Sequence, residues 1–359
     1  MSLVKRILRE SMSFDGFIVT DGTSIIDAIK KLNTNKVIVF VVSNSDHRLL
    51  GSITDGDVRR ALLKGKNVDE PVTSIMQSRP SFIKLPALDH DCLHLMQSNT
   101  ISSLPVLDDL MHIHELVFIG EKKDNPHNSN DDFKKEALIM AGGFGTRLMP
   151  LTKDCPKPML KVDGKPLLEL IINNLKNYGY SKIYISVHYL ADQIKEYFKD
   201  GSDLDIEIEY LYEDKPLGTA GCLDSLRKKI NNSFLVMNGD IITSIDFDGL
   251  LSFHLNQKSN ATMVVRPQEI KSEFGIVSTD DLEITGFKEK PVYVSYINTG
   301  IYILSPDIFN YLDGRKKDMP DLFLDMKKNG LKTIAYPMHE DWRDIGNIDQ
   351  YNKLKNEKI

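Results

Sequence analysis

The fold is decided by EALIMAGGFGTRL, residues 136–148, where an apolar run ends in three closely spaced glycines. Glu136 to Ala141 is predicted to be a buried strand that leads directly into a glycine loop. Glycine lets the backbone approach a phosphate closely, and successive backbone N–H groups form a nest for an anion. Arg147 adds a permanent charge with forked donors. No Gly-Lys-Ser/Thr follows and the spacing is not GxGxxG, so a plain tight turn remains the alternative.

From this loop to residue 237, predicted strands and helices alternate. The helix predicted at 166–178 begins at a proline and ends before Gly179. Such alternation indicates an α/β fold with a mostly parallel sheet covered on both faces, and ligands are expected beyond the carboxyl ends of its strands. The further strands are predicted at 182–187, 206–211 and 234–237, and the further helices at 190–199 and 220–230.

A second basic residue follows the loop closely. Lys157 lies between Pro156 and Pro158, which fix the backbone around it, so its amine is able to reach the same phosphates. The alternative is an ordinary solvated loop lysine.

Glycine loop and proline-flanked lysine together resemble the signature of the sugar-1-phosphate nucleotidylyltransferases. The resemblance extends in the same order to the C-terminus. Its further motifs are Pro216-Leu217-Gly218-Thr219-Ala220-Gly221, Asn238-Gly239-Asp240, Phe274-Gly275-Ile276-Val277, Glu289-Lys290-Pro291, Asn298-Thr299-Gly300 and Trp342-Arg343-Asp344-Ile345-Gly346.

The resemblance implies a role for each matching residue. The catalytic residues are Arg147, Lys157 and Asp240. Magnesium is held by Asp240 and Asp344. The nucleotide is bound by Ala141, Gly142, Gly143, Gly145, Thr146, Gly218 and Thr219. The sugar phosphate is bound by Gly275, Glu289, Lys290 and Asn298.

The chemistry of such a transfer suits these residue types. A sugar 1-phosphate oxygen attacks the α-phosphorus of a nucleoside triphosphate and pyrophosphate leaves, so two anions must be brought together. Positioning and electrostatic stabilisation do most of the catalytic work, and no protein nucleophile is needed. Mg²⁺ prefers oxygen ligands from one or two carboxylates plus phosphates. For Asp240, the alternative is a turn residue at a strand end.

The first part of the chain repeats an α-β-β pattern. Helices are predicted at 24–32 and 88–97, and strands at 37–42, 50–53, 104–107 and 116–119. The repeats resemble a tandem CBS pair, and Gly51 to Arg59 match that family's T-x-x-D segment. The resemblance implies that Thr54 and Asp57 bind an adenine nucleotide, although Asp57 also suits a helix N-cap. The second repeat lacks the T-x-x-D motif. CBS pairs often associate with one another, so the resemblance favours a homodimer or a higher homo-oligomer.

Length, charge and composition indicate the number of domains, the kind of ligand and the compartment. The chain has 359 residues, suggesting two domains, and a formal net charge of -6, which gives no case for nucleic-acid binding. We expect a CBS pair at 1–122, a polar linker at 123–135 and a nucleotidyltransferase domain at 136–359. Three separated cysteines, no apolar run long enough for a membrane span and no apolar leader favour a cytoplasmic protein.

The order of the two parts is similar to guanylyltransferases of bacterial surface-sugar pathways. The resemblance implies GTP with mannose 1-phosphate or glucosamine 1-phosphate, for surface-glycan or legionaminic-acid-type sugars. Two alternatives stay open: a UTP-, CTP- or dTTP-dependent hexose-1-phosphate nucleotidylyltransferase, and a non-catalytic regulatory subunit of the same fold. A regulatory subunit is expected to have lost Arg147, Lys157 or one of the aspartates, and this chain keeps them all.

Overall fold

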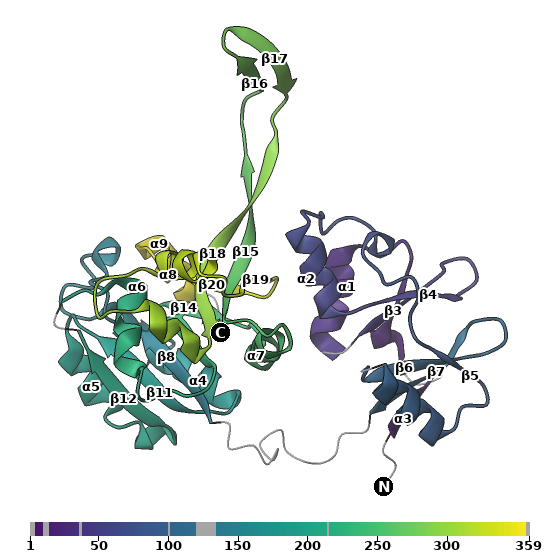
Figure 1. Ribbon diagram of the computed structural model, residues 1–359, viewed down its shortest axis with the longest axis horizontal. Coiled ribbons are helices and arrows are strands. Elements are labelled where there is room, and N and C mark those ends of the chain that lie inside the picture. The colour runs from purple at the N-terminus through teal and green to yellow at the C-terminus, as the bar shows by residue number, and fades with distance from the viewer. Residues whose placement is uncertain are drawn as a thin grey trace. The chain divides into compact units, whose positions relative to one another are not determined.

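The computed structural model describes residues 4–9, 14–35, 38–99, 101–119, 134–213 and 215–356. The chain divides into two compact units, Met1–Asn130 and Asp131–Ile359 (Figure 1). Most of the linker predicted at 123–135 lies outside the described residues, and its last residue, Lys135, already begins a strand.

The N-terminal unit contains two strand–helix repeats. Its elements are β1 (Val4–Leu8), β2 (Ile18–Thr20), α1 (Ile25–Asn35), β3 (Val39–Val42), β4 (Leu49–Ile53), α2 (Asp55–Leu63), β5 (Ile83–Lys84), α3 (Asp89–Ser98), β6 (Ser103–Leu107) and β7 (Ile113–Ile119). The predicted α-β-β pattern is confirmed, but β2 and β5 also precede the helices. β2, β3 and β4 form one sheet, and β1, β7, β6 and β5 form the other.

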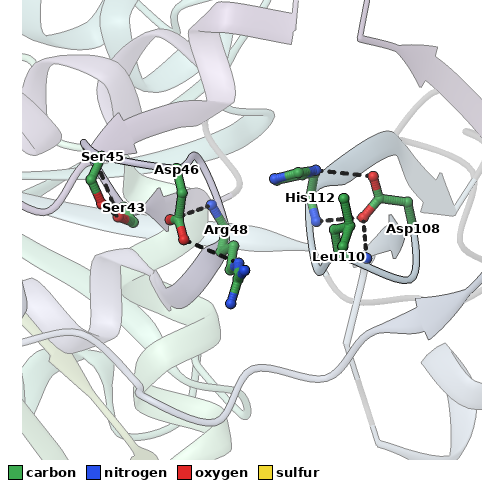
Figure 2. Close-up of polar contacts among 7 residues, drawn as sticks. All are labelled: Ser43, Ser45, Asp46, Arg48, Asp108, Leu110 and His112. Atoms are coloured by element: carbon green, nitrogen blue, oxygen red, sulfur yellow. Dashed lines mark hydrogen bonds and ion pairs between the residues drawn. The ribbon is translucent and has the colours of Figure 1, made fainter.

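The two repeats meet at equivalent hairpin turns (Figure 2). In one turn Asp46 binds Arg48, and in the other Asp108 accepts hydrogen bonds from the backbone N–H groups of Leu110 and His112. An antiparallel bridge joins Arg48 to His112. Each turn is therefore closed by its own aspartate, and the backbone bridge between the turns joins the two repeats.

The C-terminal unit is built on a seven-stranded sheet of order β12-β11-β8-β13-β18-β15-β19. The first four strands are parallel, whereas β18 runs antiparallel to both of its neighbours. These strands are β8 (Lys135–Met140), β11 (Tyr180–Val187), β12 (Glu207–Tyr212), β13 (Phe234–Asn238), β15 (Ala261–Lys271), β18 (Val292–Leu304) and β19 (Thr333–Pro337). The predicted α/β fold with a mostly parallel sheet is confirmed.

Both faces of this sheet are buried. Along β8, Ala137 and Ile139 belong to one apolar cluster and Leu138 to the other, as the alternation of side chains across a strand requires. The first cluster includes side chains of α4 (Leu167–Asn177), α5 (Ala191–Phe198) and α7 (Phe247–Asn256). The second includes side chains of α8 (Met319–Lys328) and two 3₁₀ helices, Cys222–Leu226 and Pro306–Tyr311.

The smaller elements are 3₁₀ helices at Phe14–Phe17, Val72–Ser74, Thr146–Leu148, Lys157–Met159 and Ser202–Leu204, strands β9 (Lys161–Val162), β10 (Lys165–Pro166), β14 (Ile241–Thr243), β16 (Ile276–Asp280), β17 (Glu283–Lys288) and β20 (Trp342–Asp344), and helix α9 (Ile348–Asn356). None of the helices in the described ranges is long and apolar enough to cross a membrane.

One predicted helix is wrong. In place of a helix over 220–230, a single turn, α6 (Gly218–Gly221), passes into the 3₁₀ helix that ends at Leu226. The Arg227 guanidinium, just after this segment, bonds the Asp224 carboxylate and the carbonyl of Leu312, and so joins the segment to the end of the 3₁₀ helix Pro306–Tyr311.

Candidate active site

The parallel strands deliver four segments to one edge of the sheet. β8 ends at the glycine loop, β11 ends before His188, β12 before Glu213, and β13 before Gly239. Because these strands are parallel, their carboxyl ends share this edge, where the sequence predicts ligands.

A cavity of about 260 Å³ lies at this edge. It lies where the sequence analysis expects ligands, beyond the carboxyl ends of the parallel strands, and it brings together seven of the predicted site residues. Its lining is Met140, Ala141, Gly142, Gly143, Lys157, Pro158, Glu213, Pro216, Gly218, Thr219, Cys222, Asn238, Gly239 and Asp240.

Lys157 is held inside this site. It begins a 3₁₀ helix after Pro156, and its amine forms an ion pair with Oδ2 of Asp240. The Lys157 side chain is only 12% exposed, so it is not an ordinary solvated loop lysine. The pair places one cation and one carboxylate at the cavity wall.

Asp344 lies beside Asp240 through backbone pairing. β14 follows Asp240 directly and pairs with β20, which sets Ile241 opposite Asp344. The backbone N–H of Ile345 also donates to the Asp240 carbonyl at 3.2 Å. Burial raises the pKa of the Asp344 carboxyl, and the Asp240 charge raises it further, while Lys157 and Arg147 act in the opposite direction. Two acidic groups from distant segments are thus forced together.

These two carboxylates fit a divalent cation. Oδ1 of Asp240 is buried and has no hydrogen-bond partner in the described part of the chain, whereas Oδ2 takes Lys157. A buried carboxylate oxygen without a donor is costly unless a cation meets it. Asp240 and Asp344 with phosphate oxygens would make the oxygen-rich set that Mg²⁺ prefers.

Gly218 shapes the wall formed by the Pro216–Gly221 segment. Its φ is +76°, and an added Cβ would lie 2.6 Å from Oδ1 of Asp318. The same Asp318 oxygen accepts the backbone N–H of Thr219 at 3.0 Å. Only glycine fits this left-handed, crowded position, and this keeps the segment close to the cavity.

A second cavity of about 380 Å³ shares Thr219 and Asn238 with the first. Asn298 lies on its wall, where its amide donates to the Tyr302 hydroxyl and accepts the Gly300 N–H. Trp342 donates to the Thr299 carbonyl, fixing the strand that bears Asp344. The further lining residues are Ile241, Pro320, Asp318 and Asp344.

Other predicted site residues lie off these cavities. Gly145 and Thr146 line neither of them, and Arg147 is exposed, close enough to Asp344 to affect its pKa. Gly275, Glu289 and Lys290 lie on a projecting part of the unit, beside β16 and β17, and are not among the lining residues. Their sugar-phosphate role stays a prediction.

Glu213 is the lining residue that sequence reasoning missed. Its carboxylate accepts hydrogen bonds from the Ser186 hydroxyl and from the backbone N–H of Leu217 at 3.0 Å. Its place directly after β12 is a usable signal, because an acidic residue that ends a parallel strand faces the ligand edge.

In the N-terminal unit Thr54 and Asp57 bind each other. Thr54 is the N-cap of α2, and the Asp57 carboxylate accepts the backbone N–H of Thr54 at 2.9 Å and its hydroxyl at 2.7 Å. The prediction of Asp57 as N-cap is therefore wrong by three positions, because Asp57 is the N3 residue of a capping box. An adenine nucleotide there stays a prediction.

Comparison with known proteins agrees with this geometry. The model of the nucleotidyl transferase family matches residues 136–358, and the model of the CBS domain matches residues 4–64. The chain belongs to the nucleotidyl transferase family. The resemblance found in the sequence is therefore confirmed, with a CBS domain preceding the transferase part.

The relatives of this chain within that family differ in the base of the nucleotide that their names give. Over 237 residues the chain is 34% identical to a protein of Synechocystis sp. named UTP–glucose-1-phosphate uridylyltransferase, covering 60% of this chain and 61% of that protein. Over 218 residues it is 36% identical to the D-glycero-alpha-D-manno-heptose 1-phosphate guanylyltransferase of Campylobacter jejuni, covering 60% and 96%. The chain thus spans about three fifths of the first protein's length.

A solved structure shares the fold. A putative glucose-1-phosphate thymidylyltransferase from Bacillus anthracis superposes with a TM-score of 0.50 at 25% identity, over 62% of this chain and 94% of that one. The relatives agree on sugar-1-phosphate nucleotidylyl transfer and disagree on the base.

Proposed function

We propose that this protein transfers a guanylyl group from GTP to a sugar 1-phosphate and releases pyrophosphate. The observation that carries the reaction class is the grouping of three charged residues next to the glycine loop: Lys157 and Asp240 line the first cavity, and Asp344, which lines the second, is held beside Asp240 by the pairing of β14 with β20. It supplies what joining two anions requires: a buried cation, two carboxylates for a metal and a backbone that approaches phosphates.

In the proposed reaction an oxygen of the sugar 1-phosphate forms a bond to the α-phosphorus, and the bond from that phosphorus to the bridging oxygen of pyrophosphate breaks. Lys157 stabilises the negative charge that grows on the phosphoryl oxygens. The glycine loop N–H groups orient the triphosphate for in-line attack. A magnesium ion held by Asp240 and Asp344 would neutralise phosphate charge, and Lys157 would then turn from Asp240 to the phosphates.

Glu213 supports GTP over UTP and dTTP. Each of its carboxylate oxygens takes one donor from the protein and retains capacity for another. Guanine presents two adjacent donors on its Watson–Crick edge, the N1–H and the N2 amino group. Uracil and thymine present one N–H between two carbonyl oxygens, which a carboxylate repels. A carboxylate in the cavity wall therefore matches guanine.

Pyrophosphate release tests the proposal, across four nucleoside triphosphates and the 1-phosphates of mannose, glucosamine, glucose and a heptose. We expect release with GTP and one sugar. Release with UTP or dTTP instead would support the reaction but refute guanine as the base. No release with any pair of substrates, with and without adenine nucleotides, would favour a regulatory subunit.

The Glu213→Gln variant tests the base assignment separately. Losing charge-assisted hydrogen bonds to guanine is expected to lower kcat/KM for GTP about 10- to 100-fold and to raise use of UTP relative to GTP. Glu209→Gln is the matched control, because Glu209 lies on β12, the strand that leads to Glu213, but pairs with Lys229 and does not line the cavity. Unchanged GTP preference in Glu213→Gln would refute the assignment.

A further inference from the structure

The two cavities of the site share a wall. Thr219 and Asn238 line both of them, and Asp318 lines the second. Thr219 belongs to the Pro216–Gly221 segment and Asp318 directly precedes α8, so this wall is built from two stretches of chain about a hundred positions apart. Whatever joins these two stretches also joins the two cavities.

Backbone hydrogen bonds hold the two stretches together. The Lys317 N–H donates to the Leu217 carbonyl at 2.9 Å. The Lys317 carbonyl accepts the N–H groups of Ala220 and Gly221, at 2.9 and 3.2 Å. The Lys317 amine itself donates to the Tyr311 carbonyl at 2.8 Å. The stretch before α8 is therefore a fixed support for the segment that shapes the first cavity.

Side chains add a reciprocal link between Thr219 and Asp318. Oδ1 of Asp318 accepts the backbone N–H of Thr219 at 3.0 Å and its hydroxyl at 3.4 Å. The Thr219 hydroxyl oxygen in turn accepts the N–H of Met319, the first residue of α8, at 2.8 Å. Asp318 is the N-cap of α8 but makes no side-chain cap within that helix. Each residue thus satisfies an N–H group at the start of the other's helix, in the way that an N-cap does.

This link responds to the water around it. Thr219 and Asp318 are both exposed. A hydrogen bond between exposed groups contributes little to stability, because water competes for both partners, and removing that water strengthens the bond. A ligand in the first cavity would cover Thr219, and a ligand in the second would cover Thr219 and Asp318. Either ligand would therefore strengthen the link that holds the wall for the other.

We propose that Asp318 is a positioning residue that couples the binding of the two substrates. The triphosphate occupies the first cavity and the sugar phosphate the second, an assignment that rests on the proposed function. Whichever substrate binds first orders and covers the Thr219–Asp318 link, so the other substrate meets a wall that is already in place. Asp318 is not among the residues that line the first cavity, so the coupling acts on binding rather than on the chemical step.

Trp342 reports binding in the second cavity without catalysis. It is the only tryptophan of the chain and lines this cavity, where its indole N–H donates to the Thr299 carbonyl. Its fluorescence is titrated with the four sugar 1-phosphates of the pyrophosphate assay, with and without α,β-methylene GTP, which cannot release pyrophosphate. If another triphosphate is active, its α,β-methylene analogue is used instead. We expect the analogue to tighten sugar-phosphate binding to the wild type about 5- to 10-fold.

Three variants isolate the link. Asp318→Ala removes the acceptor, so the analogue should no longer change the dissociation constant of the sugar phosphate. Asp318→Asn loses the charge but retains an oxygen that accepts the Thr219 N–H, so it should keep the coupling. Asp321→Ala is the matched control, because Asp321 lies in the first turn of α8 and lines neither cavity, and it should behave as the wild type does.

Steady-state kinetics give a second readout, which a merely structural role would not move in the same way. At saturating sugar phosphate, Asp318→Ala should raise KM for the triphosphate about 5- to 10-fold and change kcat less than about twofold. Asp318→Asn should restore the wild-type KM. A variant that lowers kcat and leaves KM unchanged would contradict a role in positioning.

The outcomes distinguish this inference from the proposed function. An active wild type in which the analogue leaves sugar-phosphate binding unchanged would overturn the coupling and leave the proposed function standing. Wild-type coupling in Asp318→Ala, or its loss in Asp318→Asn, would do the same. A wild type that releases no pyrophosphate with any pair of substrates, and whose Trp342 emission responds to no sugar phosphate, would refute the proposed function and the coupling with it.

Discussion

At the scale of single residues, Asp240 joins the two halves of the site. One of its oxygens is paired with Lys157, and the other is buried without a donor. It lies two residues after β13, directly before β14, so its position is fixed by the sheet and by the β14–β20 pairing next to it. A residue placed this firmly, with an oxygen left unsatisfied, is suited to a metal rather than to a turn.

Asp240→Asn should lower kcat at least about 100-fold, since a metal carboxylate contributes several kcal/mol of transition-state stabilisation. Steady-state pyrophosphate release measures this loss. Asp248→Asn is the control, because Asp248 pairs with Lys135 outside the cavity and should leave kcat unchanged. An Asp240→Asn enzyme as active as that control would remove Asp240 from the reaction.

His254 makes folding sensitive to acid. It is fully buried among the hydroxyls of Thr262, Ser305 and Ser233, and burial lowers its pKa to about 4 from an ordinary value of 6.5. Between these two values the unfolded chain binds a proton that the folded chain does not, so stability falls as pH falls through this window. The loss is about 3 kcal/mol by pH 4.

Chemical denaturation at several pH values from 7 to 4 measures this dependence. His254→Gln keeps a polar side chain without the titration, so its stability should fall less steeply between pH 6.5 and 4. Equal slopes for the two proteins would show that other groups cause the acid sensitivity.

At the scale of elements, the loops that follow parallel strands form the site, and their glycines are not equivalent. Gly218 has a left-handed φ and no room for a Cβ, whereas Gly143 has open space around its Cβ position. The Pro216–Gly221 segment is therefore locked by local geometry. The glycine loop is more tolerant at Gly143.

Gly218→Ala should destabilise the fold by about 1–2 kcal/mol or more, through the left-handed backbone and the clash with Asp318. Gly143 lines the same cavity, and Gly143→Ala should change the stability little because its Cβ position is open. Thermal unfolding of the two variants beside wild type decides this. Similar melting temperatures for Gly218→Ala and Gly143→Ala would mean that the segment rearranges without cost.

The capping box of α2 makes a prediction for the N-terminal unit. Asp57→Ala removes the acceptor of the Thr54 backbone N–H and hydroxyl, so it should destabilise the ligand-free unit by about 1 kcal/mol. Asp91→Ala is the control, since Asp91 is the third residue of α3, whose N-cap Leu88 makes no side-chain cap. Calorimetry with and without AMP separates this structural loss from a loss of nucleotide binding.

At the scale of the whole molecule, a transferase unit is joined to a unit with a CBS domain. All the residues that line the two cavities of the site belong to the C-terminal unit, and the second cavity has acidic but no basic side chains among its described lining residues.

The sequence by itself determined the local and the repetitive features. The glycine loop, the strand–helix alternation and Lys157 between two prolines are written in neighbouring residues, because backbone freedom and side-chain periodicity are local properties. These features predict the fold class, and the motifs, taken in their order, predict the family.

The tertiary structure alone decided which residues meet. Asp240 and Asp344 lie about a hundred positions apart and are brought together by the pairing of β14 with β20 and by the hydrogen bond from the Ile345 N–H to the Asp240 carbonyl. Glu213 lies at the cavity because β12 is parallel to β11 and β11 is parallel to β8, so that the three strands end at the same edge of the sheet. Thr54, rather than Asp57, became the N-cap because the chain turned three residues earlier. Such contacts depend on sheet order and on direction, which no single stretch of sequence contains.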